Sequence, residues 1–512
     1  MKAFLMFPDR DFPMTAPLVP NAAVLVKDLE LEMLFTAMAD DDAFVLEVAR
    51  RALLMSLDSP HVIRYRQAIL ADSLQQAVVV RELYAIAEEA LEREKKVWGW
   101  TSMRSSPEGT LMRSREVLGG VYFDLLKRLR RVAEEHASKF QSEGFSRLFE
   151  LLVAELSDEF LVEVSSHLEG LALREQMVMS AELGNSNEGV HYILRKPRPH
   201  QGWWQRVQEW RAGTLRKEPT SYAYEIHPRD EQGARALSEL RGKGVARVAA
   251  ALGESTEHLT SFFEMLRREL AFYVGCLNLR ERLLTRGAPF CLPDALPVEA
   301  IALSAEGLYD VALSLKSEGV VGNTVEADEK ALIFVTGANR GGKSTFLRSV
   351  GQAQLMMQAG LFVGAEAFRA NVCSGLFTHY KKEEDASMKS GKLDEELSRM
   401  SAIVDEVKPR ALVLCNESFG STNEREGSEI ARQIVSALLE HQIKVLYVTH
   451  MYELAQGFYA RAEANSLFLR AERLPDETRT FRMDVGEPLE TSYGADLYRR
   501  IFKREPEAVG AS

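Results

Sequence analysis

The sequence predicts a multidomain protein in which a mainly α-helical region is followed by an α/β domain with a phosphate-binding loop. Its 512 residues are too many for one hydrophobic core. Apolar residues follow helical spacing over residues 28–96, 145–168 and 254–273, which indicates helices. After residue 298, short apolar runs alternate with helical pattern, which is typical of a parallel sheet.

Composition narrows the class of protein. Hydrophobic residues make up 46% and charged residues 27%, values of a soluble globular protein. The net charge is −12, so a polyanion has to be met by a local basic patch. The four cysteines form no C-x-x-C pair, which argues for a reducing compartment and against a structural zinc site. The first apolar stretch is too short for a signal peptide, and no run reaches membrane-spanning length. We therefore expect a cytoplasmic protein with no membrane partner.

Composition shifts suggest four parts. Residues 1–100 are expected to form a helical region with an irregular, proline-rich start, and residues 101–286 two long helical arms. A small irregular or β insertion is expected at about 188–235, after a breaker cluster at 184–187 and with a short strand near 222–226. Residues 287–297 read as a linker, and the α/β domain is expected to extend to residue 465, with its first strand at 300–304. Residues 466–512 are expected to form a hairpin and a short helix at 495–502.

The α/β domain contains the most informative motif. Residues 337–344 match G-x-x-x-x-G-K-[ST], a loop whose backbone N–H groups surround nucleotide phosphates. An apolar run at 331–335 precedes it and a helical pattern follows, the order that phosphate binding at a helix N-terminus requires. Lys343 is placed to reach the β- and γ-phosphates, and Ser344 to bind Mg²⁺. The expected nucleotide-binding set is Gly337, Ala338, Asn339, Arg340, Gly341, Gly342, Lys343, Ser344 and Thr345.

Two further apolar runs, 411–415 and 444–448, read as buried strands that end in polar residues. Ligands bind at the carboxyl ends of parallel strands, so these residues are candidates for chemistry. Glu417 is the candidate general base, and His450 can hydrogen-bond the γ-phosphate or the attacking water. Asn416 occupies the position where ATPases with this kind of phosphate loop usually present an Asp to Mg²⁺. Its amide oxygen is a weaker metal ligand than a carboxylate.

Two polar segments offer further phosphate contacts. Residues 420–423 form a polar loop that follows Glu417 closely. Residues 381–396 form a charge run, which is usually a solvated helix face. Within that run, Ser387, Ser390 and Gly391 can instead present hydroxyl and N–H donors to a phosphate.

In their order, residues 336–345, 416–417, 420–422, 427–431 and 449–450 resemble the ATPase domain of the MutS-type DNA mismatch repair family. The resemblance covers about residues 300–460, and more weakly residues 63–72 and the arms, which look like the core and lever regions of that family. It implies an ABC/MutS-type P-loop ATPase that uses ATP and Mg²⁺, with Asn339 at the γ-phosphate and Ser344 and Asn416 at the metal. It also implies a homodimer, in which Ser387, Ser390, Gly391, Ser421 and Asn423 contact the ATP of the partner subunit.

The sequence departs from the pattern of that family at three places. No Phe-x-Glu mismatch-reading element occurs in the first hundred residues, and the N-terminal part is too short for a mismatch domain and a connector domain. Residues 392–396 replace the Ser-Thr-Phe segment of the family, and Asn416 replaces its aspartate. The chain therefore most resembles the short, MutS-like branch that lacks the N-terminal mismatch-recognition domain.

The arm insertion is the candidate nucleic-acid contact. The segment from residue 191 to residue 217 contains seven basic residues and one acidic residue, which gives it a net charge of +6. The expected contacts are Arg195, Lys196, Arg198, Trp203 and Trp204, because cations neutralise phosphates and exposed aromatic rings stack on bases. The competing interpretation is that the tryptophans form a small core and the charges a solvated face.

The preferred interpretation is a dimeric, Mg²⁺-dependent ATPase that couples nucleotide state to DNA binding, in mismatch repair or related processing of DNA structures. One alternative is a nucleotide-gated nucleic-acid-binding protein that hardly hydrolyses ATP, because of Asn416. Another is a related ABC-type chromosome-maintenance ATPase; the arms lack sustained heptads, which counts against it.

Overall fold

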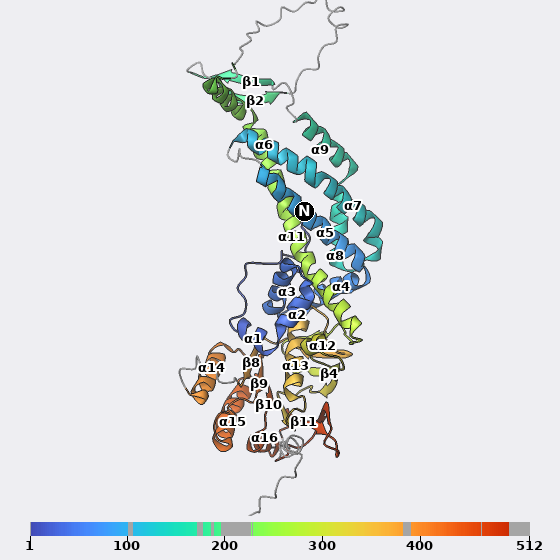
Figure 1. Ribbon diagram of the computed structural model, residues 1–512, viewed down its shortest axis with the longest axis vertical. Helices are drawn as coiled ribbons and strands as arrows, with labels where there is room; N and C mark the ends of the chain where they lie inside the picture. The colour runs from blue at the N-terminus through green and yellow to red at the C-terminus, as the bar shows by residue number, and fades with distance from the viewer. Residues whose placement is uncertain are drawn as a thin grey trace, which may run out of the picture. The chain divides into compact units, whose positions relative to one another are not determined.

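The computed structural model describes residues 2–100, 106–171, 178–185, 189–195, 227, 229–381, 391–461 and 463–490 (Figure 1). The chain divides into two compact units. The first, here called the helical unit, contains Met1–Ala3, Glu82–Ser138 and Arg147–Arg267. The second, here called the sheet unit, contains Phe4–Arg81, Lys139–Ser146 and Arg268–Ser512. Within the described residues, no helix is both long and apolar enough to cross a membrane.

The helical unit consists mainly of helices, and some of these extend into chain segments that belong to the sheet unit. They are α5 (Ala77–Trp100), α6 (Pro107–Arg115), the π-helix η1 (Glu116–Tyr122), α7 (Phe123–His136), α8 (Glu143–Glu155), α9 (Asp158–Gly170) and α11 (Glu231–Thr285). Tyr122 and Phe263 pack with ring centroids 5.0 Å apart. The predicted helical character is confirmed, but the pattern over 145–168 forms two helices. The break occurs because the Ser157 hydroxyl accepts the Phe160 N–H at 3.2 Å and so begins α9.

A short hairpin belongs to the same unit. Strand β1 (Val178–Leu183) pairs antiparallel with β2 (Gly189–Arg195). The breaker residues Gly184 and Asn185 therefore lie between two strands. The β insertion was predicted to begin at about residue 188, but its first strand begins at Val178. The strand predicted near residues 222–226 lies outside the described residues.

The sheet unit begins with an irregular segment that is packed into the protein. Leu5, Phe7 and Phe12 are all at most 1% exposed, although they belong to no helix or strand. Four helices follow: α1 (Ala22–Asp28), α2 (Leu31–Ala39), α3 (Ala43–Met55) and α4 (Pro60–Gln75). The predicted irregular start and helical continuation are confirmed. Apolar spacing in a short proline-rich segment could not reveal that it would be buried.

The main sheet has six strands in the order β12-β11-β6-β10-β9-β8. Their bounds are Leu332–Gly337 (β6), Leu376–Tyr380 (β8), Leu412–Asn416 (β9), Lys444–Val448 (β10), Ser466–Arg473 (β11) and Arg479–Val485 (β12). Strands β8, β9, β10, β6 and β11 pair in parallel, and β12 pairs antiparallel with β11. The predicted parallel sheet and C-terminal hairpin are confirmed, and the hairpin joins the main sheet. The helix predicted at 495–502 lies outside the described residues.

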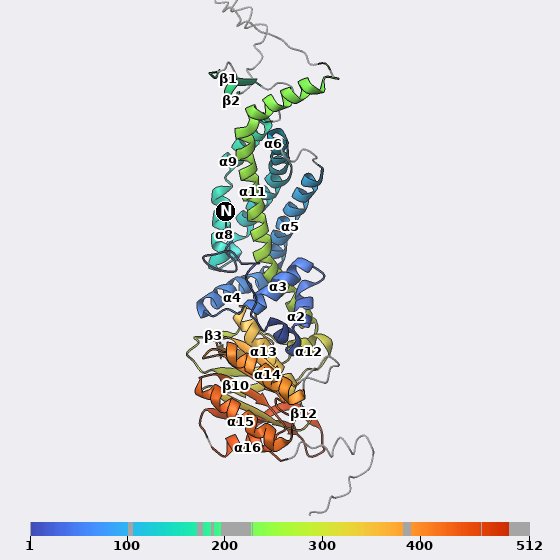
Figure 2. The same ribbon diagram turned by 90° about the vertical axis from the view of Figure 1, so that its left-hand side faces the viewer.

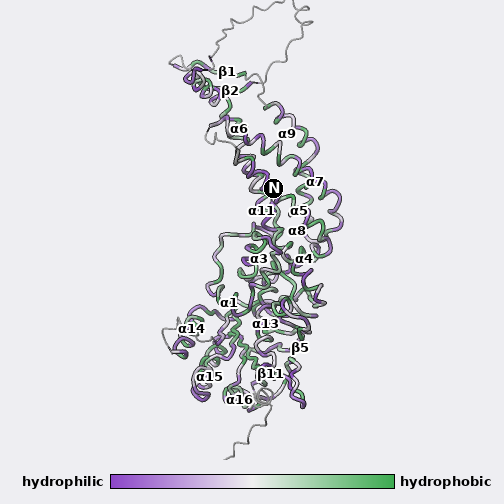
Figure 3. The backbone as a smooth tube through the Cα atoms, in the orientation of Figure 1, coloured by the Kyte–Doolittle hydropathy of each residue, from purple (hydrophilic) through white to green (hydrophobic). Residues whose placement is uncertain are grey.

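Helices cover both faces of this sheet (Figure 1 and Figure 2). Alternating side chains, such as Phe334, Val413 and Tyr447, form one apolar core. Helices α14 (Lys392–Glu406), α15 (Glu424–Glu440) and α16 (Tyr452–Tyr459) supply residues to that core. Helix α13 (Lys343–Gln358) packs on the opposite face, where Gly351 lies against Leu414. In Figure 3, α14 and α15 also show hydrophilic turns, as expected for helices with one face in solvent.

A second, four-stranded sheet has the order β3-β7-β4-β5. It contains β3 (Asp294–Leu296), β4 (Leu303–Leu308), β5 (Asn323–Glu326) and β7 (Ala367–Asn371), with α12 (Val311–Lys316) after β4. Two predictions were wrong here. The segment 287–297 is not only a linker, because Ala295 is fully buried and pairs with Ala370. The strand predicted at 300–304 lies at 303–308, because pairing with β7 and β5 decides its ends.

Candidate nucleotide-binding site

The phosphate loop joins β6 to α13 and depends on its glycines. Gly337 has a φ of 103° and Gly342 a φ of 90°, values that side chains rarely allow. A Cβ on Gly341 would come within 2.8 Å of the Ala338 carbonyl oxygen. Helix α13 begins directly after Gly342, so its first N–H groups, which have no partner within the helix, face the loop. The predicted strand, loop and helix are therefore present in the predicted order.

Lys343 folds back over this loop. Its Nζ donates to the carbonyl oxygens of Gly337 at 3.0 Å and Ala338 at 3.2 Å, and the residue is 6% exposed. Burial lowers the pKa of the Lys343 ammonium, while the nearby Glu417 carboxylate opposes that change. The charge is thus held at the loop by carbonyl dipoles and by a carboxylate, and can turn to an anionic oxygen with little movement.

The two expected metal-binding side chains lie together. The Ser344 hydroxyl donates to the Asn416 amide oxygen at 3.0 Å, across the ends of α13 and β9. A hydroxyl and an amide oxygen are hard oxygen ligands of the kind that Mg²⁺ binds, usually with several waters retained. The donor set therefore fits a hydrated Mg²⁺ ion. Among the described residues, no cluster of three or more His, Cys, Asp or Glu side chains offers another metal site.

Glu417 and His450 form a pair at the ends of β9 and β10. One Glu417 carboxylate oxygen accepts the His450 backbone N–H at 3.1 Å and also contacts the ring Nδ1. Glu417 has a φ of 55°, a conformation that costs about 1–3 kcal/mol and is concentrated at functional sites. The hydrogen bond to Glu417 raises the pKa of His450, burial opposes the rise, and Lys381 also lowers it.

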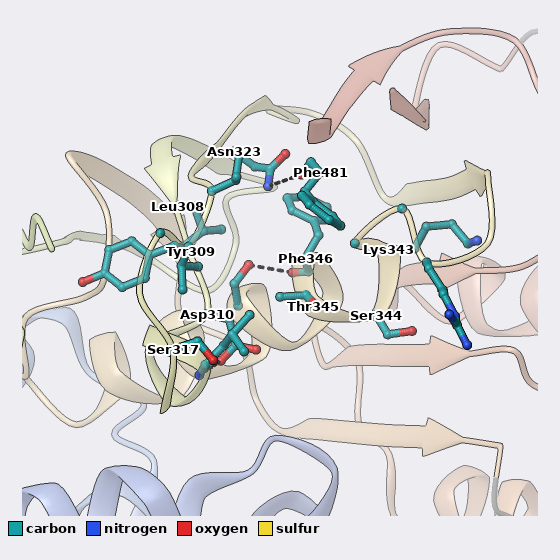
Figure 4. A pocket seen from close by; sticks show the side chains of 18 of the residues that line it. Leu308, Tyr309, Asp310, Ser317, Asn323, Lys343, Ser344, Thr345, Phe346 and Phe481 are labelled. Atoms are coloured by element: carbon teal, nitrogen blue, oxygen red, sulfur yellow. Dashed lines mark hydrogen bonds between the residues drawn. The ribbon is translucent and has the colours of Figure 1, made fainter. Parts of the chain in front are cut away.

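A cavity of about 430 Å³ opens beside the phosphate loop (Figure 4). Its wall includes residues 339–345 and Glu417, which were predicted from the sequence, and also residues that no motif indicated. Most of those come from β4, β5, the connection between these strands and β12, and they include Asp310, Val320, Asn323 and Phe481. Asn323 holds β12 in place, donating to the Phe481 carbonyl at 3.2 Å and accepting the Met483 N–H at 2.8 Å.

Arg479 on β12 approaches the loop itself. Its Nε donates to the Asn339 carbonyl oxygen at 2.9 Å, while the Asn339 side chain belongs to the cavity wall. The guanidinium also lowers the pKa of Lys343, so two cations lie near the phosphate loop. The sequence showed Arg479 only as a hairpin residue, because the contact depends on β11 pairing with β6.

The residues expected at a partner subunit are engaged within the chain where the structure describes them. Ser421 donates to the Glu396 carboxylate at 2.8 Å. Asn423 accepts the Glu426 N–H at 3.0 Å and caps α15, and Gly391 precedes α14. Ser387 and Ser390 lie outside the described residues.

Only part of the expected nucleic-acid contact can be placed. Arg195 is exposed at the end of β2, and its Nε donates to the Ser180 hydroxyl at 2.9 Å. Lys196, Arg198, Trp203 and Trp204 lie outside the described residues. Their expected role stays a prediction.

Comparison with known proteins agrees with this architecture. Residues 58–286 match the MutS2 N-terminal domain, and residues 333–506 match MutS domain V. A DNA mismatch repair protein MutS from Chloroflexus aurantiacus is 30% identical over 154 residues, covering 29% of this chain and 16% of that protein. An Endonuclease MutS2 from Thermus thermophilus is 30% identical over 186 residues, covering 35% of this chain and 24% of that protein. A DNA mismatch repair protein MutS from Methanosarcina mazei is 29% identical over 264 residues, covering 50% of this chain and 29% of that protein.

A helical region followed by an α/β domain with a glycine-rich loop defines the class of protein, and the two domain matches identify the family. The chain belongs to the MutS family. The match of residues 58–286 to the MutS2 N-terminal domain confirms the predicted short, MutS-like type within the printed sequence. The chain spans less than a third of the length of each of these relatives.

Proposed function

We propose that this chain is a P-loop ATPase of the ABC/MutS type that hydrolyses ATP with Mg²⁺ and couples its nucleotide state to DNA binding. One observation carries the proposal: Lys343, Ser344, Asn416, Glu417 and His450, which come from three separate segments, meet beside one cavity and one glycine-rich loop. Phosphoryl transfer needs this combination of phosphate cradle, cation, metal ligands and water-positioning carboxylate.

The residues divide the chemistry among themselves. The loop N–H groups and Lys343 bind the phosphates, with the Lys343 ammonium exchanging its carbonyl partners for phosphate oxygens. Mg²⁺, held by Ser344 and Asn416 when bound, supplies charge neutralisation at the β- and γ-phosphate oxygens. Glu417 accepts a proton from water as the water oxygen bonds to the γ-phosphorus, and the bond to the ADP oxygen breaks. His450 orients the Glu417 carboxylate through its two contacts.

The cavity beyond the loop fits the nucleoside. Phe481 is 47% exposed, lines the cavity and lies against Gly342, so its ring is available for a base to stack on. Val320 and Leu308 add apolar surface to the cavity wall, and Asn323 adds polar atoms. An adenine held here leaves its phosphates over the N-terminus of α13.

A second candidate function is a nucleotide-gated binding protein with little hydrolysis. Asn416 favours it, because a neutral amide occupies the metal-facing position and already accepts the Ser344 hydroxyl. Single-turnover hydrolysis, measured beside equilibrium ATP binding, separates the two functions. Tight binding with no phosphate release over hours supports the second.

The nucleotide site is tested by Lys343→Ala. This change removes the cation from the loop, and charge-assisted contacts contribute about 1.5–3 kcal/mol each, so ATP affinity falls about 10- to 100-fold. Lys408→Ala is the matched control, because Lys408 is an exposed lysine that precedes β9, at the other end of the strand from Asn416. Equal ATP affinity of Lys343→Ala and wild type would show that the loop is not a nucleotide site.

We further propose a homodimer in which residues 387–391 and 421–423 complete the partner's ATP site. Ser421 would exchange its Glu396 contact for a phosphate of the partner subunit. Sedimentation of Glu417→Gln with and without ATP tests this. A monomer under both conditions at micromolar protein excludes a composite site.

DNA is the proposed macromolecular partner, and the insertion at 188–235 the proposed contact. A panel of branched, mismatched, duplex and single-stranded DNA, with RNA beside it, identifies the structure that is bound, with and without ATP. Replacing Arg195, Lys196 and Arg198 together with Ala is expected to weaken binding across sequences and to reduce the salt slope by about one unit per lost phosphate contact. An unchanged slope moves the contact elsewhere on the arms.

A further inference from the structure

Lys381 lies at the edge of the sheet where the candidate catalytic residues gather, although no motif contains it. It follows β8 directly, and β8 pairs in parallel with β9 so that Tyr380 stands opposite Asn416. The Lys381 backbone N–H donates to the Asn416 carbonyl at 2.9 Å. The parallel register therefore places Lys381 beside Glu417 at the carboxyl ends of the strands.

The Lys381 side chain binds the turn that carries Glu417. Its Nζ donates to the Gly420 carbonyl oxygen at 2.9 Å. A Cβ built on Gly420 would stand 3.5 Å from Lys381 Nζ and 3.6 Å from His450 Cε1. The ammonium and the imidazole thus flank the same point of the turn, and Glu417 contacts that imidazole.

The turn from Glu417 to Gly420 requires support, because two of its residues are strained. Glu417 has a φ of 55° and Phe419 a φ of 61°. The middle of the turn is held by the core: the Ser418 hydroxyl donates to the His379 carbonyl at 2.7 Å, and Phe419 is 1% exposed. Its last residue, Gly420, is held by the Lys381 ammonium.

Lys381 keeps its positive charge unpaired as far as the described residues show. Within the described ranges, no carboxylate forms an ion pair with it, and the residue is exposed. Its field reaches the catalytic pair, since Lys381 lowers the pKa of His450. Glu417 and Glu424, the other charged groups near that imidazole, act in the opposite direction.

We propose that Lys381 is a positioning residue for ATP hydrolysis: its ammonium fixes the strained Glu417–Gly420 turn and keeps the Glu417 carboxylate aimed at the reacting water. This inference rests on the proposed ATPase function. It assigns to Lys381 an effect on turnover and none on ATP binding, because the phosphate loop belongs to β6 and α13.

The first test compares three variants by ATP affinity and by single-turnover rate. Lys381→Met removes the donor and the charge but keeps the length of the chain. Its rate is expected to fall about 10- to 100-fold, the size of effect that a misplaced catalytic group produces, while ATP affinity stays at the wild-type value. Lys381→Arg keeps a cationic donor and restores most of the rate. Lys408→Met, an exposed lysine before β9, behaves as wild type.

The second test does not need turnover. In the nucleotide-free, metal-free protein, NMR titration of ¹³C-labelled histidine follows the His450 imidazole, assigned with His450→Gln. Its pKa is expected to rise in Lys381→Met and to stay at the wild-type value in Lys381→Arg and Lys408→Met.

Three results would overturn the inference. The first is a wild-type rate with an unchanged His450 pKa in Lys381→Met. The second is equal losses of rate and ATP affinity in Lys381→Met, and the third is a rate in Lys381→Arg as low as in Lys381→Met. Failure of the proposed function is recognised separately, because it appears as wild-type protein that does not bind ATP or that binds ATP equally well after Lys343→Ala.

Discussion

The sheet unit contains two groups of buried or half-buried ionisable side chains, and they differ in what their polar atoms already bind. Beside the phosphate loop, Lys343 and Glu417 line a cavity, and His450, which contacts Glu417, has a side chain that is 44% exposed. Around the N-terminal segment, Arg66 and Glu269 are fully buried. Glu269 accepts the backbone N–H groups of Leu5, Met6 and Phe12. Arg66 donates to the carbonyls of Met6 at 2.7 Å and Ala359 at 3.1 Å.

Shifted pKa values alone would rank these groups wrongly. Burial raises the pKa of Glu269 to about 7 and lowers that of Arg66 to about 10. For Glu417, by contrast, it is the contacts and the cavity that point to chemistry. Perturbed titration identifies a functional candidate only where a ligand can reach the group. Arg66 and Glu269 hold residues 4–12 against the fold, whereas Lys343 and Glu417 line a cavity that a ligand can enter.

The largest expected effect comes from Glu417→Gln. The amide keeps the shape of the side chain but cannot accept a proton, so single-turnover hydrolysis is expected to fall by about two to four decades. ATP binding survives, because the phosphate loop is unchanged. Glu440→Gln, an exposed residue at the end of α15, serves as the control. An unchanged rate would assign the base to another residue and remove the contrast with Glu269.

Glu269→Ala is expected to act on stability alone. It leaves three buried backbone N–H groups without an acceptor, and disruption of such a site costs about 3 kcal/mol. Denaturant unfolding measures the loss, and hydrolysis per folded molecule is expected to stay at the wild-type value. If the folded variant loses turnover instead, the N-terminal cluster belongs to the functional machinery.

The pH dependence of stability gives a finer test of the same cluster. The pKa of Glu269 is about 7 in the fold against an ordinary value of 4.5, so the folded protein holds this proton more tightly. The stability from this proton is fully present below pH 4.5 and is lost as the pH rises through 7, by at most about 1.4 kcal/mol per pH unit. Glu269→Gln has no proton to lose. The Tm of wild type should therefore fall relative to the Tm of this variant from pH 5 to 8; a constant difference contradicts the assignment.

The smallest effect is expected from Asn416→Asp. A carboxylate can still accept the Ser344 hydroxyl and binds Mg²⁺ better than an amide, so turnover is expected to be unchanged or a few-fold faster. Hydrolysis over a Mg²⁺ titration measures it, with a lower Mg²⁺ requirement as the second expected sign. A large loss would mean that the neutral amide has a role of its own in this site.

Sequence alone went furthest where neighbouring residues carry the information. The order of strand, loop and helix around 337–344 is local, and the glycines report the backbone conformations that the turn requires. The positions of Glu417 and His450 followed from a general property of parallel sheets, whose carboxyl ends share one edge. Apolar periodicity likewise indicated the helices, although the cap at Ser157 and the early start of α11 were missed.

Only the tertiary structure decided which remote residues complete the site. Phe481 lies 139 positions after Gly342, and Asn323 lies 14 positions before Gly337. Both residues line the cavity beside the loop because β11 pairs with β6 and β5 lies beside β12. Lys381 reaches Gly420 because β8 pairs with β9. The burial of residues 4–12 depends on Glu269, which lies 257 positions after Phe12, and on Arg66, which lies 60 positions after Met6. Local motifs are encoded by backbone conformations that a few adjacent residues impose. Contacts between distant strands arise from the sheet order that buries the most apolar surface, and a single sequence does not display that order.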